Sequence, residues 1–196
     1  MPKKKAAKAN AKNAAIDFST AFKYPFRRFA GLFNILWFLF IIVGWFALFG
    51  YSVKIVREFV DGKFRQLPVF RFKENLKLGF PMFFKFLPLL LAVVGVNIIL
   101  MMIPILGILG ALAFDIFVVP MLAINFFVKG TVESSFDIKK VHAVFNNIED
   151  YLVVILKSIG LGLIFFIMIF ILVGIPASVF GKNIFLADFY RRKARN

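Results

Sequence analysis

The longest apolar stretch of the chain, FLPLLLAVVGVNIILMMIPILGILGALAFDIFVVPMLAINFFV at residues 86–128, decides how the sequence folds. Its 43 residues contain a single charged side chain, Asp115. A helix needs about 20 apolar residues, at a rise of about 1.5 Å each, to cross the hydrocarbon core of a bilayer. The stretch is twice that long, and Pro104 followed by Gly107 breaks it near the centre. It therefore predicts two membrane helices joined by a tight turn.

Two further stretches carry no charge, 25 residues at 29–53 and 24 residues at 158–181. Each is long enough for one crossing. The whole chain is 61% hydrophobic and 18% charged, whereas soluble domains are about half apolar and about a quarter charged. The sequence therefore predicts an all-α integral membrane protein with four transmembrane helices, near residues 29–61, 82–103, 105–129 and 152–181.

The net charge of +15 is concentrated beside these apolar stretches. Residues 1–28 form a basic N-terminal tail, residues 182–196 form a basic C-terminal tail, and the predicted membrane domain covers residues 29–181. A Lys or Arg near an anionic membrane surface gains about 1 kcal/mol. Nucleic acid is the less favoured partner, because both tails adjoin membrane helices. We expect anionic lipid headgroups to contact the basic residues Lys3, Lys4, Lys5, Arg27, Arg28, Arg191, Arg192 and Lys193.

The orientation of the membrane domain follows from its Lys and Arg residues, which are more frequent in cytoplasmic loops. With four crossings, both termini and the turn at 104–107 share one side and carry 13 Lys and Arg, while the two polar loops share the other side and carry 12. This difference decides little. We expect both termini of a multi-pass cell-membrane protein to be cytoplasmic, because acidic neighbours neutralise few of their basic groups.

An internal repeat relates two parts of the chain. Residues 46–62 align without a gap with residues 114–130, and five positions are identical. Both copies end in glycine, Gly62 and Gly130, and glycine commonly stops a helix because it reaches positive φ without a Cβ clash. The repeat predicts two related helical hairpins.

A polar segment with an apolar stripe follows each of these glycines. Residues 72–80 carry Phe72, Leu76 and Phe80 at helical spacing, and Asp137 is placed to cap a helix that continues to residue 152. We expect each hairpin to carry an interfacial amphipathic helix here. The apolar face of each helix either packs on the bundle or meets lipid or a partner.

Asp115 is the single charge within an apolar stretch. An ionised carboxylate near mid-membrane costs about 2.5 to 3.5 kcal/mol, so we expect Asp115 to face protein or to be protonated. Asn97 on the preceding helix is its expected neighbour, and Asn34 is a third intramembrane polar candidate. These residues form either a proton or cation site or hydrogen bonds between helices. A single acid without a second acid or a basic partner favours the hydrogen bonds.

Enzymatic chemistry is not expected from this sequence. The chain has no cysteine, which excludes a thiol nucleophile, a disulfide and a cysteine-bound metal, and it has one histidine, His142. A metal site would need carboxylate partners for that histidine. The sequence contains no Gly-rich phosphate loop. We therefore expect no catalytic residue, no metal and no cofactor.

Several short motifs have a distinctive order and spacing. They are FKYPFRR at 22–28, GY at 50–51, DGKFRQLPVF at 61–70, LKLGF at 76–80, ESSFDIKKV at 133–141 and FLADFYRRKAR at 185–195. In these motifs the chain resembles the domain of unknown function 4013 family of prokaryotic multi-helix membrane proteins, over about residues 18–190. The resemblance implies a membrane location and a multi-helix plan, and it implies no established activity.

Six residues at motifs and helix ends are expected to be structural, namely Tyr24, Pro25, Gly62, Pro68, Pro104 and Gly130. For function, the sequence favours a non-enzymatic membrane protein that acts as an accessory or scaffold subunit or engages anionic lipid. A membrane-protein partner or a homo-oligomer is compatible with this role. The alternative is a small oligomeric transporter or channel that uses Asp115, because four helices alone enclose little space.

Overall fold

The computed structural model describes residues 14–39, 43–63, 65–171 and 173–195. Within these residues the chain is helical and contains no β-strand. Three helices are long and apolar enough to cross a membrane: Phe72–Met101, Leu106–Lys129 and Ile148–Phe170. The prediction of an all-α chain is confirmed for the described residues, and these three helices have the length and composition of membrane spans.

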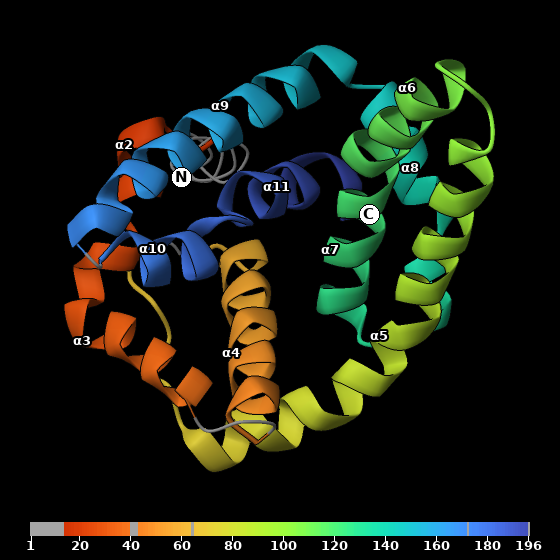
Figure 1. The fold of residues 1–196 in the computed structure, drawn as a ribbon. Helices are drawn as coiled ribbons and strands as arrows, with labels where there is room; N and C mark the ends of the chain where they lie inside the picture. Colours follow the sequence, from red (N-terminus) through yellow and green to blue (C-terminus); the bar gives the residue numbers. More distant parts are fainter. Residues whose placement is uncertain (1–13, 40–42, 64, 172, 196) are drawn as a thin grey trace, which may run out of the picture.

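Figure 1 shows the helices arranged around α4, which lies in the middle of the molecule. In chain order they are α2 (Phe18–Lys23), η1 (Pro25–Arg28), α3 (Phe29–Leu32), η2 (Phe33–Leu39), α4 (Val43–Val60), α5 (Phe72–Met101), α6 (Leu106–Ala113), η3 (Phe114–Val118), α7 (Val119–Lys129), η4 (Glu133–Phe136), α8 (Ile138–Phe145), α9 (Ile148–Ile167), η5 (Met168–Ile171), α10 (Gly174–Gly181), α11 (Ile184–Phe189) and η6 (Tyr190–Ala194).

The expected helix at 29–61 is instead a hairpin, in which η2 packs against α4. The indole Nε1 of Trp45 donates a hydrogen bond to the carbonyl of Phe38 (3.1 Å), and the two rings stack with centroids 5.3 Å apart. A single helix over these residues would be about 50 Å long, far more than the bilayer core requires. Among the described residues, the structure therefore has three helices with the length and composition of a span.

The first expected amphipathic segment, 72–80, is the beginning of α5 and not a separate helix. Helix α5 continues through Pro81 and Pro88 to Met101, and it curves across the lower edge and up the right side of Figure 1. Proline removes a helical hydrogen bond and commonly bends a helix. The second segment agrees better with its prediction, because α8 is a separate helix that ends before α9 begins at Ile148.

Helices α4 and α5 cross where a glycine of each faces the other. A Cβ atom built on Gly50 would lie 2.7 Å from the backbone nitrogen of Gly79, and one built on Gly79 would lie 2.6 Å from the nitrogen of Gly50. Each would also overlap a backbone carbonyl oxygen, of Asn75 and of Phe46 respectively. Only glycine fits at either position. Close backbone packing through small residues is a common way for membrane helices to associate.

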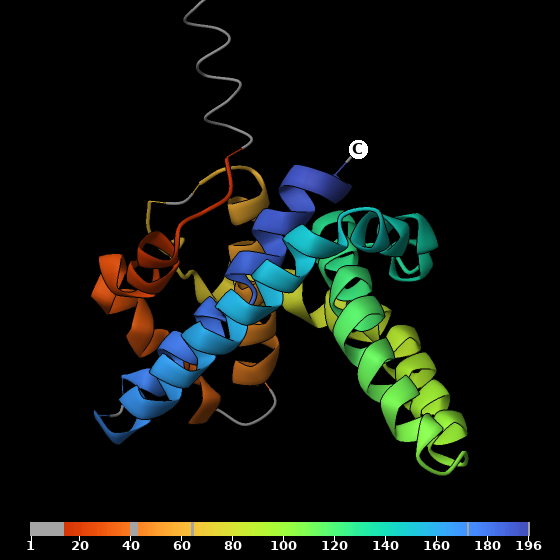
Figure 2. The ribbon, with the colours of Figure 1, turned by 90° about the horizontal axis from the view of Figure 1, so that it is seen from above.

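Both ends of the described chain and both polar loops gather at one end of the molecule. The backbone N–H of Ile16 donates to Asp188 Oδ2 (3.1 Å), and Arg195 pairs with Asp61 beyond the end of α4 (3.0 Å). Figure 2 shows these segments at its upper edge. We call them together the polar end, which comprises residues 14–17, 61–71, 130–147 and 188–195.

The opposite end is formed by the turns of three hairpins. It contains the turn between α5 and α6, the turn between α9 and α10, and the facing ends of η2 and α4, all at the lower edge of Figure 2. We call it the apolar end. The expectation that the two polar loops lie across the membrane from the termini is therefore wrong. Each charge-free stretch turns back near its middle, which returns the chain to the side from which it came.

The residues expected to be structural occupy turns, helix ends and the core. Gly62 and Gly130 both have positive φ, 85° and 74°, as helix-stop residues require. Tyr24 and Pro25 are buried, and Tyr24 packs edge-on against Phe59 with ring centroids 5.2 Å apart. Two helices of the chain therefore end in a similar way, although a separate amphipathic helix follows only the second.

Candidate functional site

A basic cleft of about 430 Å³ opens at the polar end, between α4, the loop after it and the start of α5. Six of the lining residues come from the loop motif DGKFRQLPVF, and these lie beyond the left-handed turn at Gly62. The cleft is lined by Arg28, Lys54, Glu58, Lys63, Arg65, Gln66, Leu67, Pro68, Val69, Arg71 and Glu74.

Hydrogen bonds to backbone carbonyls hold the loop against the helices. The hydroxyl of Tyr51 donates to the carbonyl of Pro68 (3.0 Å), Lys54 donates to the carbonyl of Val69 (3.1 Å), and Arg27 donates to that of Arg65 (3.3 Å). Leu67 is fully buried. The loop is therefore a fixed wall of the cleft, with its carbonyls turned toward protein donors.

The charge around the cleft favours an anion. Five of the lining side chains are basic and two are acidic. The carboxylate of Glu74 accepts a hydrogen bond from Arg71 (2.8 Å), and this bond raises the pKa of the Arg71 guanidinium. Lys63 and Arg65 are exposed. Guanidinium and ammonium groups bind phosphate oxygens through charge-assisted hydrogen bonds, so the cleft suits a phosphate-bearing group.

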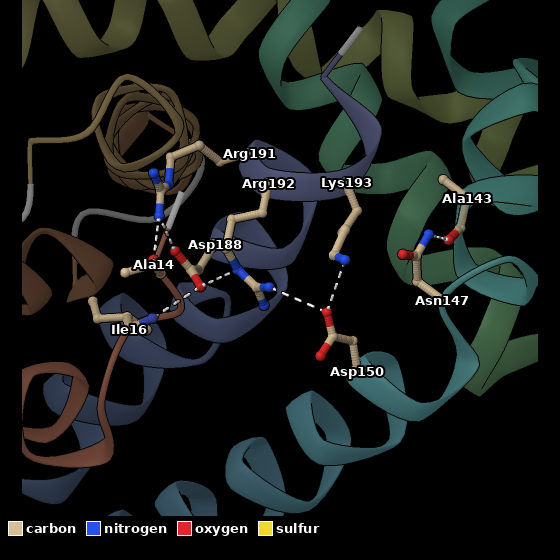
Figure 3. Close-up of polar contacts among 9 residues, drawn as sticks. All are labelled: Ala14, Ile16, Ala143, Asn147, Asp150, Asp188, Arg191, Arg192 and Lys193. Atoms are coloured by element: carbon tan, nitrogen blue, oxygen red, sulfur yellow. Dashed lines mark hydrogen bonds and ion pairs between the residues drawn. The ribbon is translucent and has the colours of Figure 1, made fainter. Parts of the chain in front are cut away.

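Two of the expected headgroup residues, Arg191 and Arg192, are instead buried and bound to acids (Figure 3). Their side chains are 7% and 8% exposed and bind the two oxygens of Asp188, at 2.7 Å and 3.0 Å. Asp188 is itself 2% exposed. A buried carboxylate is tolerated only when it is paired, which explains why these arginines point inward. A headgroup role for them is therefore wrong.

The same network joins four parts of the chain. Arg191 also donates to the carbonyl of Ala14 (3.0 Å), while Arg192 and Lys193 both reach Asp150 at the start of α9 (3.3 Å and 3.1 Å). Figure 3 shows Asp188 between the N-terminal segment and these basic residues. The C-terminal segment is thus part of the packed structure and not a free tail.

Lys193, a third expected headgroup residue, is exposed and pairs with Asp150 (3.1 Å). The remaining five divide into two groups. Lys3, Lys4 and Lys5 lie outside the described residues. Arg27 and Arg28 lie beside the basic cleft, Arg27 through its bond to the loop and Arg28 as a lining residue. The main basic surface of the structure is therefore the cleft, and not the C-terminal segment as expected.

The structure brings Asp115 and Asn97 together. The amide Nδ2 of Asn97 donates to Asp115 Oδ1 (3.0 Å) and also to the carbonyl of Val93 (3.1 Å). Asp115 lies in the π-helical turn η3 and is exposed at the surface of the hairpin, so the expectation that it faces protein does not hold within one chain. Asn34 lies elsewhere, in η2.

No metal site is visible in the described part of the chain, where no group of three or more His, Cys, Asp or Glu side chains could hold an ion. His142 is exposed on α8.

Comparison with protein families identifies the chain. A family model described as Protein of unknown function (DUF4013) matches residues 33–174. The chain belongs to this family. The DUF4013 match covers the loop of the basic cleft and all three helices long enough to span a membrane, while Asp188 and its partners Arg191 and Arg192 lie beyond its C-terminal limit. No curated protein and no solved structure matches the chain.

Sequence reasoning about this DUF4013 chain missed two polar residues that the fold uses. The first is Asp188, which the sequence places only within a basic tail. Two arginines follow this acid three and four positions later, and these spacings match helical ion pairs. Arg57 donates from α4 to the carbonyl of Phe127 near the end of α7 (2.6 Å), and burial lowers the pKa of its guanidinium. No sequence signal identifies that partner, because it is a backbone atom 70 residues away.

Proposed function

We propose that this protein is a non-enzymatic membrane protein that binds the phosphate of anionic lipid headgroups in its basic cleft, as an accessory or scaffold subunit. The observation that carries the proposal is the set of five basic side chains around one cleft at the polar end. The cell membrane is the expected location, since its cytoplasmic leaflet carries anionic lipid.

The surroundings of the cleft supply a place for lipid chains as well. An apolar groove of about 740 Å³ runs along the start of α5 and is lined by Val43, Phe46, Lys73, Leu76, Lys77, Phe80 and Pro81. Lys73 and Lys77 lie on α5, the helix that also carries Glu74 and begins one residue after Arg71. Glu74 and Arg71 line the cleft. A basic site next to an apolar groove matches a lipid with a charged headgroup better than it matches nucleic acid.

Replacing Lys63 and Arg65 by alanine tests the proposal. Both side chains are exposed and belong to the cleft. Each basic residue contributes about 1 kcal/mol, so K63A/R65A is expected to weaken binding of phosphatidylglycerol by about tenfold or more. Native mass spectrometry of the purified protein, titrated with phosphatidylglycerol or phosphatidylcholine, measures the affinity.

The variant K139A is the matched control, because Lys139 is exposed on α8 at the same end of the molecule but away from the cleft. It should bind phosphatidylglycerol like the unaltered protein. Equal binding of both lipids by the unaltered protein, without weakening at high salt, would rule out an electrostatic headgroup site.

The runner-up function is a small transporter or channel formed by several copies, with Asp115 at the contact between them. An acid exposed on an apolar helix is costly in lipid, and a neighbouring copy would cover it. If this is right, the protein is an oligomer in nanodiscs, and D115N lowers both proton flux into liposomes and the oligomeric fraction. A monomer measured by mass photometry, or flux unchanged in D115N, would exclude it.

A further inference from the structure

We infer that the chain enters the bilayer from one side only, and that its three apolar hairpins end inside the hydrocarbon core instead of crossing it. The partner surface is thus one leaflet of a lipid membrane and the adjoining part of the core. This inference does not depend on lipid binding by the basic cleft.

The distribution of charge along the hairpins is the first observation. Every Lys and Arg of the sequence lies within 1–28, 54–85, 129–157 or 182–195. The stretches between them contain the turns of the apolar end, and their only charged residue is Asp115. A chain that crossed the membrane would carry its turns into water on the far side, where polar residues are usual.

The turn between α5 and α6 is exposed and entirely apolar. Met101, Met102, Ile105 and Leu106 are 66%, 78%, 76% and 71% exposed. At the turn between α9 and α10, on the other side of the molecule in Figure 2, Phe170 is 86% exposed. Exposed apolar side chains grouped in this way suit hydrocarbon, because a large apolar patch in water is unfavourable.

Several backbone groups of the same turn are hydrogen-bonded within it. The N–H groups of Met102 and Ile103 donate to Ile99 and Leu100, and the N–H of Gly107 donates to Ile103. Proline at position 104 has no N–H, and its carbonyl accepts from Leu106 (2.7 Å). In hydrocarbon no water is present to bond such groups, so internal bonds are required there.

Ile105 closes this turn in an unusual conformation. Its φ and ψ of 59° and −63° form a γ-turn, which is rare for a side chain branched at Cβ. Gly107 permits the tight reversal, since a Cβ atom there would overlap the carbonyl oxygen of Leu100. Backbone groups of the turn therefore bond to one another, and Ile105 is strained as a result. A turn without access to water requires such internal hydrogen bonds.

Two of the hairpin legs are short for a crossing when only their charge-free part is counted, although the leg Leu106–Lys129 has the length of a span. The charge-free part of α5, from Phe86 to Met102, rises about 25 Å, and the leg from Ser158 to Ile171 rises about 20 Å. The bilayer core is about 30 Å thick, and Figure 2 shows both legs inclined to the vertical, which shortens their reach further. Lys85, in the first half of α5, donates to the carbonyl of Gly130 at the polar end (3.4 Å).

Single cysteines test the inference cleanly, because the chain has none of its own. We choose M102C and F170C at the apolar end, and K63C and K139C in the two polar loops; all four positions are exposed, so folding should be retained. Right-side-out and inside-out membrane vesicles are treated with a membrane-impermeant maleimide, before and after addition of detergent.

The expected result is that K63C and K139C react from the same face, while M102C and F170C react from neither face until detergent is added. A bimane fluorophore attached to the cysteine of M102C should then be quenched more by lipids brominated near the chain ends than by lipids brominated near the headgroup. Labelling of M102C or F170C from the face opposite to K63C would overturn the inference. Labelling of K63C and K139C from different faces would also overturn it.

Discussion

At the scale of single residues, the polar end is held by charges that lie inside the protein. Asp188 accepts from Ile16, Arg191 and Arg192 and lies almost wholly out of solvent. The pair between Arg195 and Asp61 has similar chemistry but is about half exposed. Exposed pairs contribute about 0 to 1 kcal/mol, whereas removing one partner of a buried pair costs about 3 to 5 kcal/mol.

We therefore expect D188A to lower the free energy of unfolding by about 3 kcal/mol or more, because it leaves two buried arginines without their carboxylate. The variant D61A is the control and should change it by no more than about 1 kcal/mol. Denaturant unfolding in detergent micelles, followed by tryptophan fluorescence, measures both. Similar losses in the two variants would contradict the distinction.

Tyr190 makes the stability of the protein depend on pH in the alkaline range. Its hydroxyl donates to Asn125 Oδ1 (2.5 Å), and burial raises its pKa to about 12. The unfolded value is about 10, so the stability that Tyr190 contributes is complete below about pH 10 and is lost as the pH rises toward 12.

The prediction is that Y190F loses less stability between pH 10 and pH 12 than the unaltered protein does. Thermal melts across this range, monitored by circular dichroism, provide the measurement. If the two proteins lose stability equally over this interval, the pKa of Tyr190 is not raised in the folded state.

At the scale of elements, the crossing of α4 and α5 depends on Gly50 and Gly79. Neither position has room for a Cβ atom, because each would overlap the other helix's backbone. Gly95 lies further along the same α5, and a Cβ atom there would meet nothing within 4 Å. Gly79 and Gly95 thus lie on the same helix but differ in their surroundings, because only Gly79 faces the backbone of another helix.

G79A should separate α4 from α5 and reduce the melting temperature strongly. G95A should leave it unchanged or raise it slightly, since alanine is favoured over glycine in a helix by about 1 kcal/mol. Melting in nanodiscs, measured by differential scanning fluorimetry, compares the two variants. An equal response would mean that the close approach of the helices is not essential to the fold.

At the scale of the whole molecule, the charged and apolar residues lie at opposite ends. Three hairpins descend from the polar end, and their turns at the apolar end carry no charge (Figure 2). The basic cleft and the Asp188 network both lie at the polar end, one open to solvent and the other closed. Among the described residues, the candidates for headgroup recognition therefore lie at one end of the molecule.

Much of this plan was predictable from local sequence. The break at Pro104, the stops at Gly62 and Gly130, and the proximity of Asn97 and Asp115 depend on local chemistry or helical spacing, and the structure contains them. The roles of Arg191 and Arg192 were not predictable, because a paired arginine and a lipid-facing arginine look alike in a sequence. Burial distinguishes them, and burial depends on segments more than 40 residues away.

By itself, the sequence determined that this is an all-α membrane protein with basic polar segments, because hydrophobic length and charge are properties of local composition. Only the tertiary structure decided that the charge-free stretches double back and that the termini join both polar loops at one end. A stretch of about 25 apolar residues satisfies a single crossing and a short hairpin equally well. The choice depends on close backbone contacts such as those of Gly50 with Gly79 and on buried pairs such as Asp188 with Arg191, which join residues distant in the chain or hidden within the fold.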